Sequence, residues 1–147
     1  MLIDFFERGT NKLIHTYTEM SKLKTFEERF EYLKLNGLVG VETFGWDRYL
    51  NQALYQSPEW RRCRRIVILR DNGCDLGVDG YSIGGRIIIH HINPISIEMI
   101  ENRDFMIFDL DNLVCVSHQT HEAIHYGSTD ILPKEPVERK PGDTKLW

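Results

Sequence analysis

Cysteine is scarce in this sequence, and the cysteines present are poorly placed for cross-linking. Cys63, Cys74 and Cys115 are odd in number, and no two of them form a CxxC pair. A disulfide framework or a cysteine zinc knuckle requires paired spacing. We therefore expect reduced, partly buried thiols.

Long apolar runs and an excess of positive charge are also missing. No stretch approaches the roughly 18 consecutive apolar residues of a membrane span, and the N-terminal MLIDFFERG becomes charged before a signal-peptide core could form. We expect a cytoplasmic protein without membrane contact. The net charge of −4 and the pI of about 5.8 argue against coating of nucleic acid by bulk positive charge. Any contact with a polyanion then has to be local.

The composition is that of an ordinary globular domain, because 41% of the 147 residues are hydrophobic and 27% are charged. Three regions differ in character. Residues 1–56 are expected to form a helical N-terminal extension, residues 57–127 the core, and residues 128–147 an extended tail. The tail contains Pro133, Pro136, Pro141 and Gly142, which exclude long regular elements.

Two helix starts are marked by their capping residues. TFEE at 25–28 has the pattern of a capping box, followed by Phe26, Phe30 and Leu33 on one helix face and by Gly37 as a stop signal. Ser57-Pro58 has the N-cap and first-turn residues of a second helix. On that helix we expect an apolar face of Trp60, Cys63, Ile66 and Val67, and an opposite cationic face of Arg61, Arg62, Arg64 and Arg65. The cationic face is our candidate contact for phosphate groups.

The remainder of the core predicts an alternation of short elements. Five glycines between positions 72 and 85 indicate turns. Residues 86–92 are rich in β-branched side chains and predict a strand, and residues 113–116 predict a second one. A loop or short helix connects them, and residues 119–126 predict a helix that ends at Gly127. The expected order over 86–127 is strand, loop, strand, helix.

Histidines are concentrated in this region, since five of the six lie between positions 90 and 125. His121 and His125 are four residues apart, so a helix projects both imidazoles from one face, where they can share a metal ion. His90 and His91 are adjacent on the expected strand, where successive side chains point to opposite faces. One of this pair can reach the metal while the other points elsewhere.

Three blocks of sequence resemble a known family. HHINP at 90–94, DNL at 111–113 and HEAIH at 121–125 look like the signature of HNH, or ββα-metal, endonucleases, including the nine-residue step from Asn112 to His121. Upstream, Trp60, the arginine cluster and RDNGC at 70–74 resemble the lead-in of bacteriophage HNH proteins. The resemblance covers residues 57–127 and implies an α+β fold with a ββα-metal core.

The resemblance also implies a role for each matching residue. His90, His121 and His125 would bind one divalent ion, His91 would be the general base, and Asn112 would orient His91 by a hydrogen bond. All-imidazole ligation accommodates Zn²⁺, Ni²⁺ or Mn²⁺, whereas Mg²⁺ prefers oxygen. The implied reaction hydrolyses DNA to 5′-phosphate and 3′-hydroxyl ends. The implied setting is a phage-encoded protein with DNA and phage packaging proteins as partners.

One feature of the family pattern is missing. Many HNH relatives have two CxxC pairs that bind a structural zinc ion around this motif. Here CDLG at 74–77 stands at the first place, and Ser117 and Thr120 stand at the second. We therefore expect no structural zinc, with packing holding the loop instead.

Other interpretations compete with the nuclease. HEAIH is also an HExxH string, the zinc-protease motif with Glu122 as the base, but that hypothesis leaves His90, His91 and Asn112 without a role. A catalytically inert HNH-fold module that binds nucleic acid or a packaging protein is the stronger alternative. His118 matches no family position and is expected at a polar loop or helix start, and His15 is expected to be an ordinary helix residue.

Overall fold

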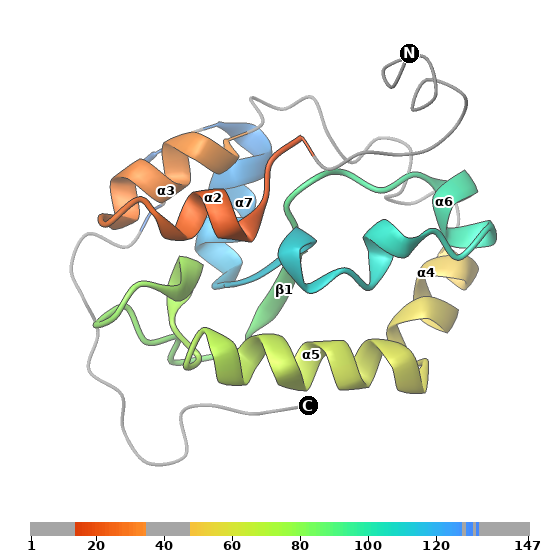
Figure 1. Ribbon diagram of the computed structural model, residues 1–147. Helices are drawn as coiled ribbons and strands as arrows, with labels where there is room; N and C mark the ends of the chain where they lie inside the picture. The colour runs from red at the N-terminus through yellow and green to blue at the C-terminus, as the bar shows by residue number, and fades with distance from the viewer. Residues whose placement is uncertain (1–13, 35–47, 128, 131, 133–147) are drawn as a thin grey trace.

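The computed structural model describes residues 14–34, 48–127, 129, 130 and 132 (Figure 1). The predicted stop at Gly37 and nearly all of the predicted tail lie outside these residues. Helices and a two-stranded antiparallel sheet together make an α+β fold, as expected. The elements are α2 (Tyr17–Ser21), α3 (Phe26–Leu33), α4 (Arg48–Tyr55), α5 (Pro58–Arg70), η1 (Asp75–Gly77), β1 (Ile88–His91), α6 (Ile97–Glu101), η2 (Phe105–Ile107), η3 (Leu110–Asn112), β2 (Leu113–Val116) and α7 (His118–Tyr126), where η denotes a 3₁₀ helix.

The β1–β2 hairpin is the centre of the fold. The strands pair antiparallel, with His90 opposite Val114 and His91 opposite Leu113. Because side chains alternate along a strand, each face of the hairpin receives every second residue. The two adjacent histidines therefore project from opposite faces.

Helix α5 covers one face of the hairpin and runs along the lower edge of the molecule in Figure 1. Trp60, Val67 and Ile68 of α5 are buried in one cluster with Ile83, Ile87, Ile89, Leu113 and Cys115. His91 is on this face. The N-cap of α5 is Ser57, whose hydroxyl accepts a hydrogen bond from the Trp60 amide, as predicted.

Helices α7, α2 and α3 cover the other face, which carries His90. The buried cluster there combines Met20, Phe26, Phe30 and Leu33 from the N-terminal helices with Leu76, Ile92, Val114, Val116, Ala123 and Ile124. Thr25 caps α3 through the Glu28 amide, as the TFEE pattern predicts, and Gly127 ends α7 in the left-handed conformation with φ of 70°. Residues 14–34 thus share a hydrophobic core with the hairpin.

The prediction for the apolar face of α5 was wrong at one position. Ile66 is 41% exposed, whereas Ile68, which was not predicted, is 2% exposed. At about 100° per residue, Ile66 lies about 120° away from Trp60, while Ile68 lies only about 80° away. The side that contacts the sheet is therefore shifted toward Ile68 and the half-buried Arg64.

A smaller cluster of Leu54, Ile100 and Ile107 joins α4, α6 and η2 at the end of the hairpin. It fixes the long connection between the strands, which was predicted only as a loop or short helix. Within the described part of the chain, no helix is long and apolar enough to cross a membrane.

Candidate metal centre

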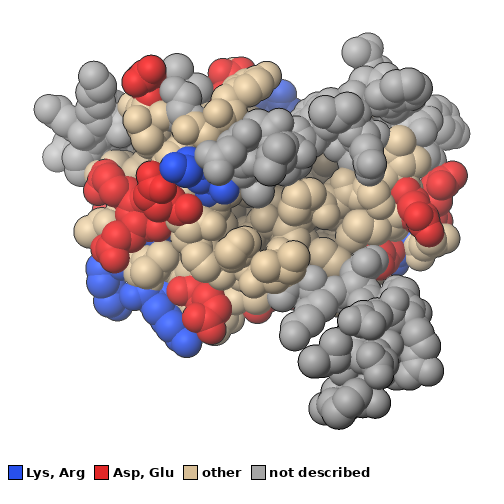
Figure 2. Space-filling model, turned by 90° about the horizontal axis from the view of Figure 1, so that it is seen from above, with Lys and Arg blue, Asp and Glu red and all other residues tan. Residues whose placement is uncertain are grey.

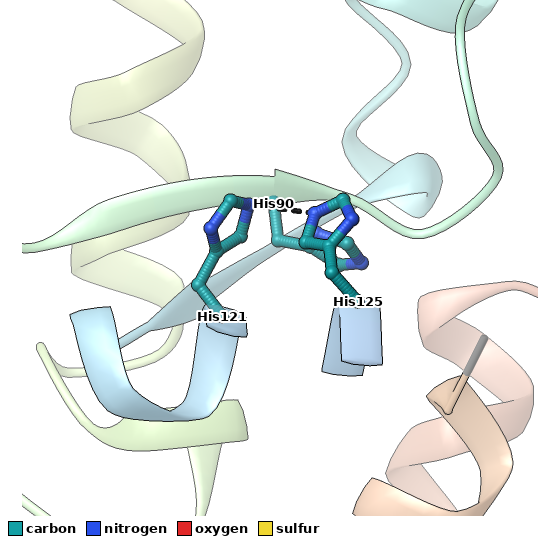
Figure 3. A group of neighbouring side chains, drawn as sticks. All are labelled: His90, His121 and His125. Atoms are coloured by element: carbon teal, nitrogen blue, oxygen red, sulfur yellow. Dashed lines mark hydrogen bonds between the residues drawn. The ribbon is translucent and has the colours of Figure 1, made fainter. Parts of the chain in front are cut away.

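Three histidines from two elements converge between β1 and α7 (Figure 3). His90 lies on β1, and His121 and His125 lie one turn apart on α7. One ring nitrogen of each lies within 4.8 Å of the other two, and the ring centroids are 4.4 to 5.5 Å apart. We call these three residues the His cluster. It could bind a metal ion, as the spacing predicts.

Burial favours the neutral form of every imidazole in the His cluster. Desolvation is the main cause: it lowers the pKa of His90 well below 6.5 and that of His121 to about 4, and it also lowers the pKa of His125. The neighbouring histidines lower the pKa of His90 and His121 further through charge repulsion. Since a metal ion binds the neutral imidazole, the cluster is in its binding form at neutral pH.

The hydrogen bonding of the His cluster is incomplete without a further group. His90 Nε2 is buried and has no hydrogen-bond partner within the described residues. His121 Nε2 and His125 Nε2 lie 3.0 Å apart, so that only one of them can donate (dashed line in Figure 3). A buried nitrogen without a partner costs about 1–3 kcal/mol, and a cation that accepts its lone pair removes this cost. Three imidazole donors therefore fit a divalent ion of the Zn²⁺ type.

His91 points away from the His cluster and packs on α5. Its ring stacks on Trp60, with a centroid distance of 5.2 Å and an interplanar angle of 27°. His91 Nε2 lies 3.0 Å from the carbonyl oxygen of Ile107. Because a carbonyl only accepts, Nε2 carries the proton and Nδ1 keeps its lone pair. Burial lowers the pKa of His91 to about 4, which the hydrogen bond to Ile107 offsets only in part.

The expected hydrogen bond from Asn112 to His91 is not made, and this prediction was wrong. Asn112 is fully buried, its amide nitrogen donates to the Met106 carbonyl at 2.8 Å, and its oxygen accepts from the backbone and side-chain nitrogens of Asn93. His91 is held by the carbonyl of Ile107, the residue next to Met106. Asn112 and His91 thus contact neighbouring carbonyls of the connection between the strands, and they make no direct hydrogen bond.

A second polar cluster lies at the start of α7. Asp75 Oδ2 accepts from Ser117 Oγ at 2.8 Å and from Thr120 Oγ1 at 2.6 Å, and Asp75 Oδ1 accepts from the Ser117 amide at 3.1 Å. We call these three residues the carboxylate cluster. Asp75 is 2% exposed, and burial raises its pKa, although these hydrogen bonds act against the rise. The cluster ties the turn after α5 to the first turn of α7.

The arginines of the predicted cationic face lie apart from the His cluster. Arg61, Arg62 and Arg65 are exposed on the side of α5 that faces away from the hairpin, while Arg64 is half-buried. Since α5 and α7 cover opposite faces of the hairpin, the exposed arginines and the His cluster are on opposite sides of the sheet. Figure 2 views the molecule from the side away from α5, and there the described Lys and Arg side chains form small separate groups beside acidic ones.

The remaining predicted residues have simple surroundings. Glu122, the base of the protease hypothesis, pairs with the exposed His118 at 3.1 Å and is not a member of the His cluster. His118 is the first residue of α7, as expected. His15 was predicted in a helix but precedes α2, and its ring contacts Tyr32. All three cysteines are free; Cys74 and Cys115 are buried and Cys63 is half-buried.

Sequence reasoning missed two residues that organise this region. Asn93 was noted only as part of the HHINP block, and Asp75 only as part of a departure from the family pattern. The signal that could have identified Asp75 was an acidic residue in a turn together with the hydroxyl pair Ser117 and Thr120. No local signal marks Asn93, because its partners are up to 79 positions away.

Comparison of the chain with protein-family models gives no match, and searches among curated proteins and solved structures find none either. The assignment to the HNH family therefore stays a prediction from the motif spacing. The three-histidine cluster and the surroundings of His91 are what the structure adds to it.

Proposed function

We propose that this protein is a metal-dependent nuclease of the HNH type, which hydrolyses phosphodiester bonds of DNA to 5′-phosphate and 3′-hydroxyl ends. The observation that carries the proposal is the convergence of His90, His121 and His125, with the adjacent His91 neutral on the opposite face. Alternation along the strand gives the two adjacent imidazoles different surroundings, and we assign His90 as a ligand and His91 as the base.

The residues of the His cluster would hold one divalent ion. When bound, the ion supplies positive charge that stabilises a phosphate oxygen and the leaving oxygen. Neutral imidazoles accommodate Zn²⁺, Ni²⁺ or Mn²⁺ more readily than Mg²⁺, which prefers oxygen ligands. The low pKa of the three ligands limits competition from protons near neutral pH.

His91 would accept a proton from the attacking water. The Ile107 carbonyl fixes the tautomer, so that the lone pair on Nδ1 is the basic site. The Trp60 ring supports one side of the imidazole and restricts its rotation. A phosphate bound beside His91 would raise its basicity, because negative charge nearby stabilises the imidazolium form.

A specific contact disfavours the protease hypothesis. Glu122 would have to face the metal, but its carboxylate pairs with His118 on the outer side of α7. The inert-module alternative remains the main rival, and it needs a damaged ligand set, whereas His90, His121 and His125 are all present and close together. Contact between DNA and the exposed arginines, and a role beside phage packaging proteins, are proposals that rest on the resemblance alone.

The test is cleavage of supercoiled plasmid by the purified protein with Mn²⁺, Ni²⁺, Zn²⁺ or Mg²⁺, beside a casein assay. We expect His91→Ala to lower the cleavage rate by about 10²- to 10⁴-fold, the usual contribution of a general base, and to leave metal affinity in isothermal titration calorimetry unchanged. Glu122→Gln should cut normally.

His118→Ala is the matched control, since it removes an exposed histidine from the same helix as two of the ligands. It should leave both cleavage and metal affinity intact. Plasmid binding without cleavage under every metal condition would select the inert module. Casein cleavage that Glu122→Gln abolishes would select the protease.

A further inference from the structure

We propose that Asn93 is a positioning residue that couples the chain segment before α2 to the orientation of the His91 imidazole. The proposal rests on the proposed function in one respect, since it treats His91 as the base. The coupling itself is a statement about hydrogen bonds within the fold. It assigns to residues 14 and 15 an influence on the site that their distance in sequence does not suggest.

The Asn93 side chain uses its full hydrogen-bonding capacity. Its oxygen accepts from the backbone amides of Ile14 and His15, both at 3.0 Å. Its nitrogen donates to the His15 carbonyl at 2.6 Å and to the Asn112 oxygen at 2.7 Å. A primary amide has two donor hydrogens and two acceptor lone pairs, and all four are used here. Asn93 is 4% exposed, so water cannot readily replace a lost partner.

From Asn93 the contacts continue to the connection that holds His91. The side-chain oxygen of Asn112 accepts hydrogen bonds from the side-chain and backbone nitrogens of Asn93, each at 2.7 Å. The side-chain nitrogen of Asn112 donates in turn to the Met106 carbonyl at 2.8 Å. The next carbonyl along η2, that of Ile107, holds His91 Nε2. Ile107 is itself fully buried. A change at Asn93 therefore reaches His91 through three hydrogen bonds and one peptide unit.

Helix α2, which follows this segment, has an attachment of its own that bypasses this route. The Thr18 amide and hydroxyl both donate to Asp111 Oδ1 at 2.8 Å. This contact anchors α2 beside Asn112 but involves neither Asn93 nor Met106. It provides a control that loosens the N-terminal segment without breaking the link to His91.

The experiment compares Asn93→Asp with the wild-type protein. The carboxylate keeps the shape and the acceptor for the amides of residues 14 and 15, but it has no hydrogen to donate to Asn112 or to the His15 carbonyl, and it places oxygen against oxygen at both. We expect the nuclear magnetic resonance signals of the His91 ring protons to move away from the position set by the ring current of the stacked Trp60. We expect kcat for plasmid cleavage to fall about tenfold to a hundredfold with KM unchanged, because small misplacement of a catalytic group is costly.

Thr18→Val is the matched control, and it should leave the His91 signals and kcat unchanged. Asn93→Ser, which is too short to reach both Asn112 and His15, provides a second variant if the aspartate impairs folding. The proposal is overturned if the His91 signals and kcat of a folded Asn93 variant match those of the wild type. It is also overturned if Thr18→Val produces the same changes, or if metal affinity falls in parallel, since either would indicate general loosening.

Failure of the proposed function gives a different result. A wild-type protein that cuts no plasmid would contradict nuclease activity, but the His91 signals of the variants would still report whether Asn93 positions the ring.

Discussion

Helix α7 carries two buried polar clusters on consecutive turns, and they differ in how completely they are satisfied. In the carboxylate cluster, both oxygens of Asp75 accept hydrogen bonds from Ser117 or Thr120. In the His cluster, His90 Nε2 has no partner within the described residues, and two imidazole nitrogens face each other at 3.0 Å. The carboxylate cluster is satisfied within the protein, whereas the His cluster leaves a buried nitrogen without a partner among the described residues.

We interpret this difference as one between a structural role for the carboxylate cluster and the functional role proposed for the His cluster. A satisfied buried network stabilises the fold and positions the elements that it joins. An unsatisfied cluster of ionisable groups costs stability, and such groups concentrate at functional sites. The comparison therefore predicts opposite responses of the two clusters to acid, to substitution and to metal ions.

Acid should produce the largest effect. His91 and His121 have a pKa of about 4 in the folded protein against 6.5 when unperturbed, so the unfolded chain binds more protons between these values. The free energy of unfolding of the metal-free protein should therefore be highest above about pH 6.5 and fall by several kcal/mol toward about pH 4. Urea denaturation across this range, in the presence of a chelator, measures the loss.

His91→Phe should show a smaller loss in the same titration, because it removes one of the groups with a lowered pKa. The raised pKa of Asp75 acts in the opposite direction. Because the folded protein binds this proton at a higher pH than the unfolded chain does, protonation of Asp75 adds to the free energy of unfolding as the pH falls through that range. A free energy of unfolding that stays constant between neutral pH and about pH 5 would contradict the assignment of the histidines.

Substitution of Asp75 should have the next largest effect. Asp75→Ala leaves the Ser117 amide and the Ser117 and Thr120 hydroxyls without their acceptor in a buried site, and should destabilise the protein by about 3 kcal/mol. Asp75→Asn should cost only about 1 kcal/mol, because an amide can donate to a hydroxyl in place of accepting from it. The midpoint of urea unfolding distinguishes the two.

Asp79→Ala is the control for this pair, since Asp79 lies exposed in the turn that follows. Its effect should stay within about 0.5 kcal/mol. A loss of stability in Asp75→Ala no greater than that of the control would mean that the carboxylate cluster contributes little.

The smallest change in stability is expected at His90. His90→Phe replaces a buried nitrogen that has no partner with an apolar group of similar shape, so the metal-free protein should gain about 1 kcal/mol. The same variant should lose the rise in Tm that a divalent ion produces in the wild type. That rise corresponds to about 2.7 kcal/mol when the ion is present at a hundred times its Kd.

The control is His118→Phe, which alters an exposed histidine outside the His cluster. It should keep the full metal-induced rise in Tm. If His90→Phe still responds to the ion, His90 is not a ligand, and the comparison between the two clusters fails.

The sequence predicted best what local patterns determine. Four features follow from residues that lie close together in the sequence. They are the cap at Thr25, the start of α5 at Ser57-Pro58, the strand 113–116 and the end of α7 at Gly127. The convergence of the His cluster was also predictable, because the spacing of four on a helix and the alternation on a strand determine where imidazoles point.

Contacts between distant segments were beyond the reach of these patterns. The bond between His15 and Asn93 joins residues 78 positions apart, and the one between Asp75 and Thr120 joins residues 45 positions apart. The error at Asn112 has the same origin, since its partner Asn93 becomes a neighbour only when the hairpin closes. Which polar groups complete one another depends on tertiary packing.

The hairpin has only four residue pairs, and their register determines which helix His90 and His91 each contact. A slip of β1 by a single position would exchange them, giving the first to Trp60 and the second to α7. The backbone bond from the Ile92 amide to the Asn112 carbonyl, at 2.8 Å, lies just beyond the last pair and opposes such a slip. Strand register therefore decides which imidazole faces α7 and which faces α5. An inserted or deleted residue in this hairpin would be more damaging than many side-chain replacements.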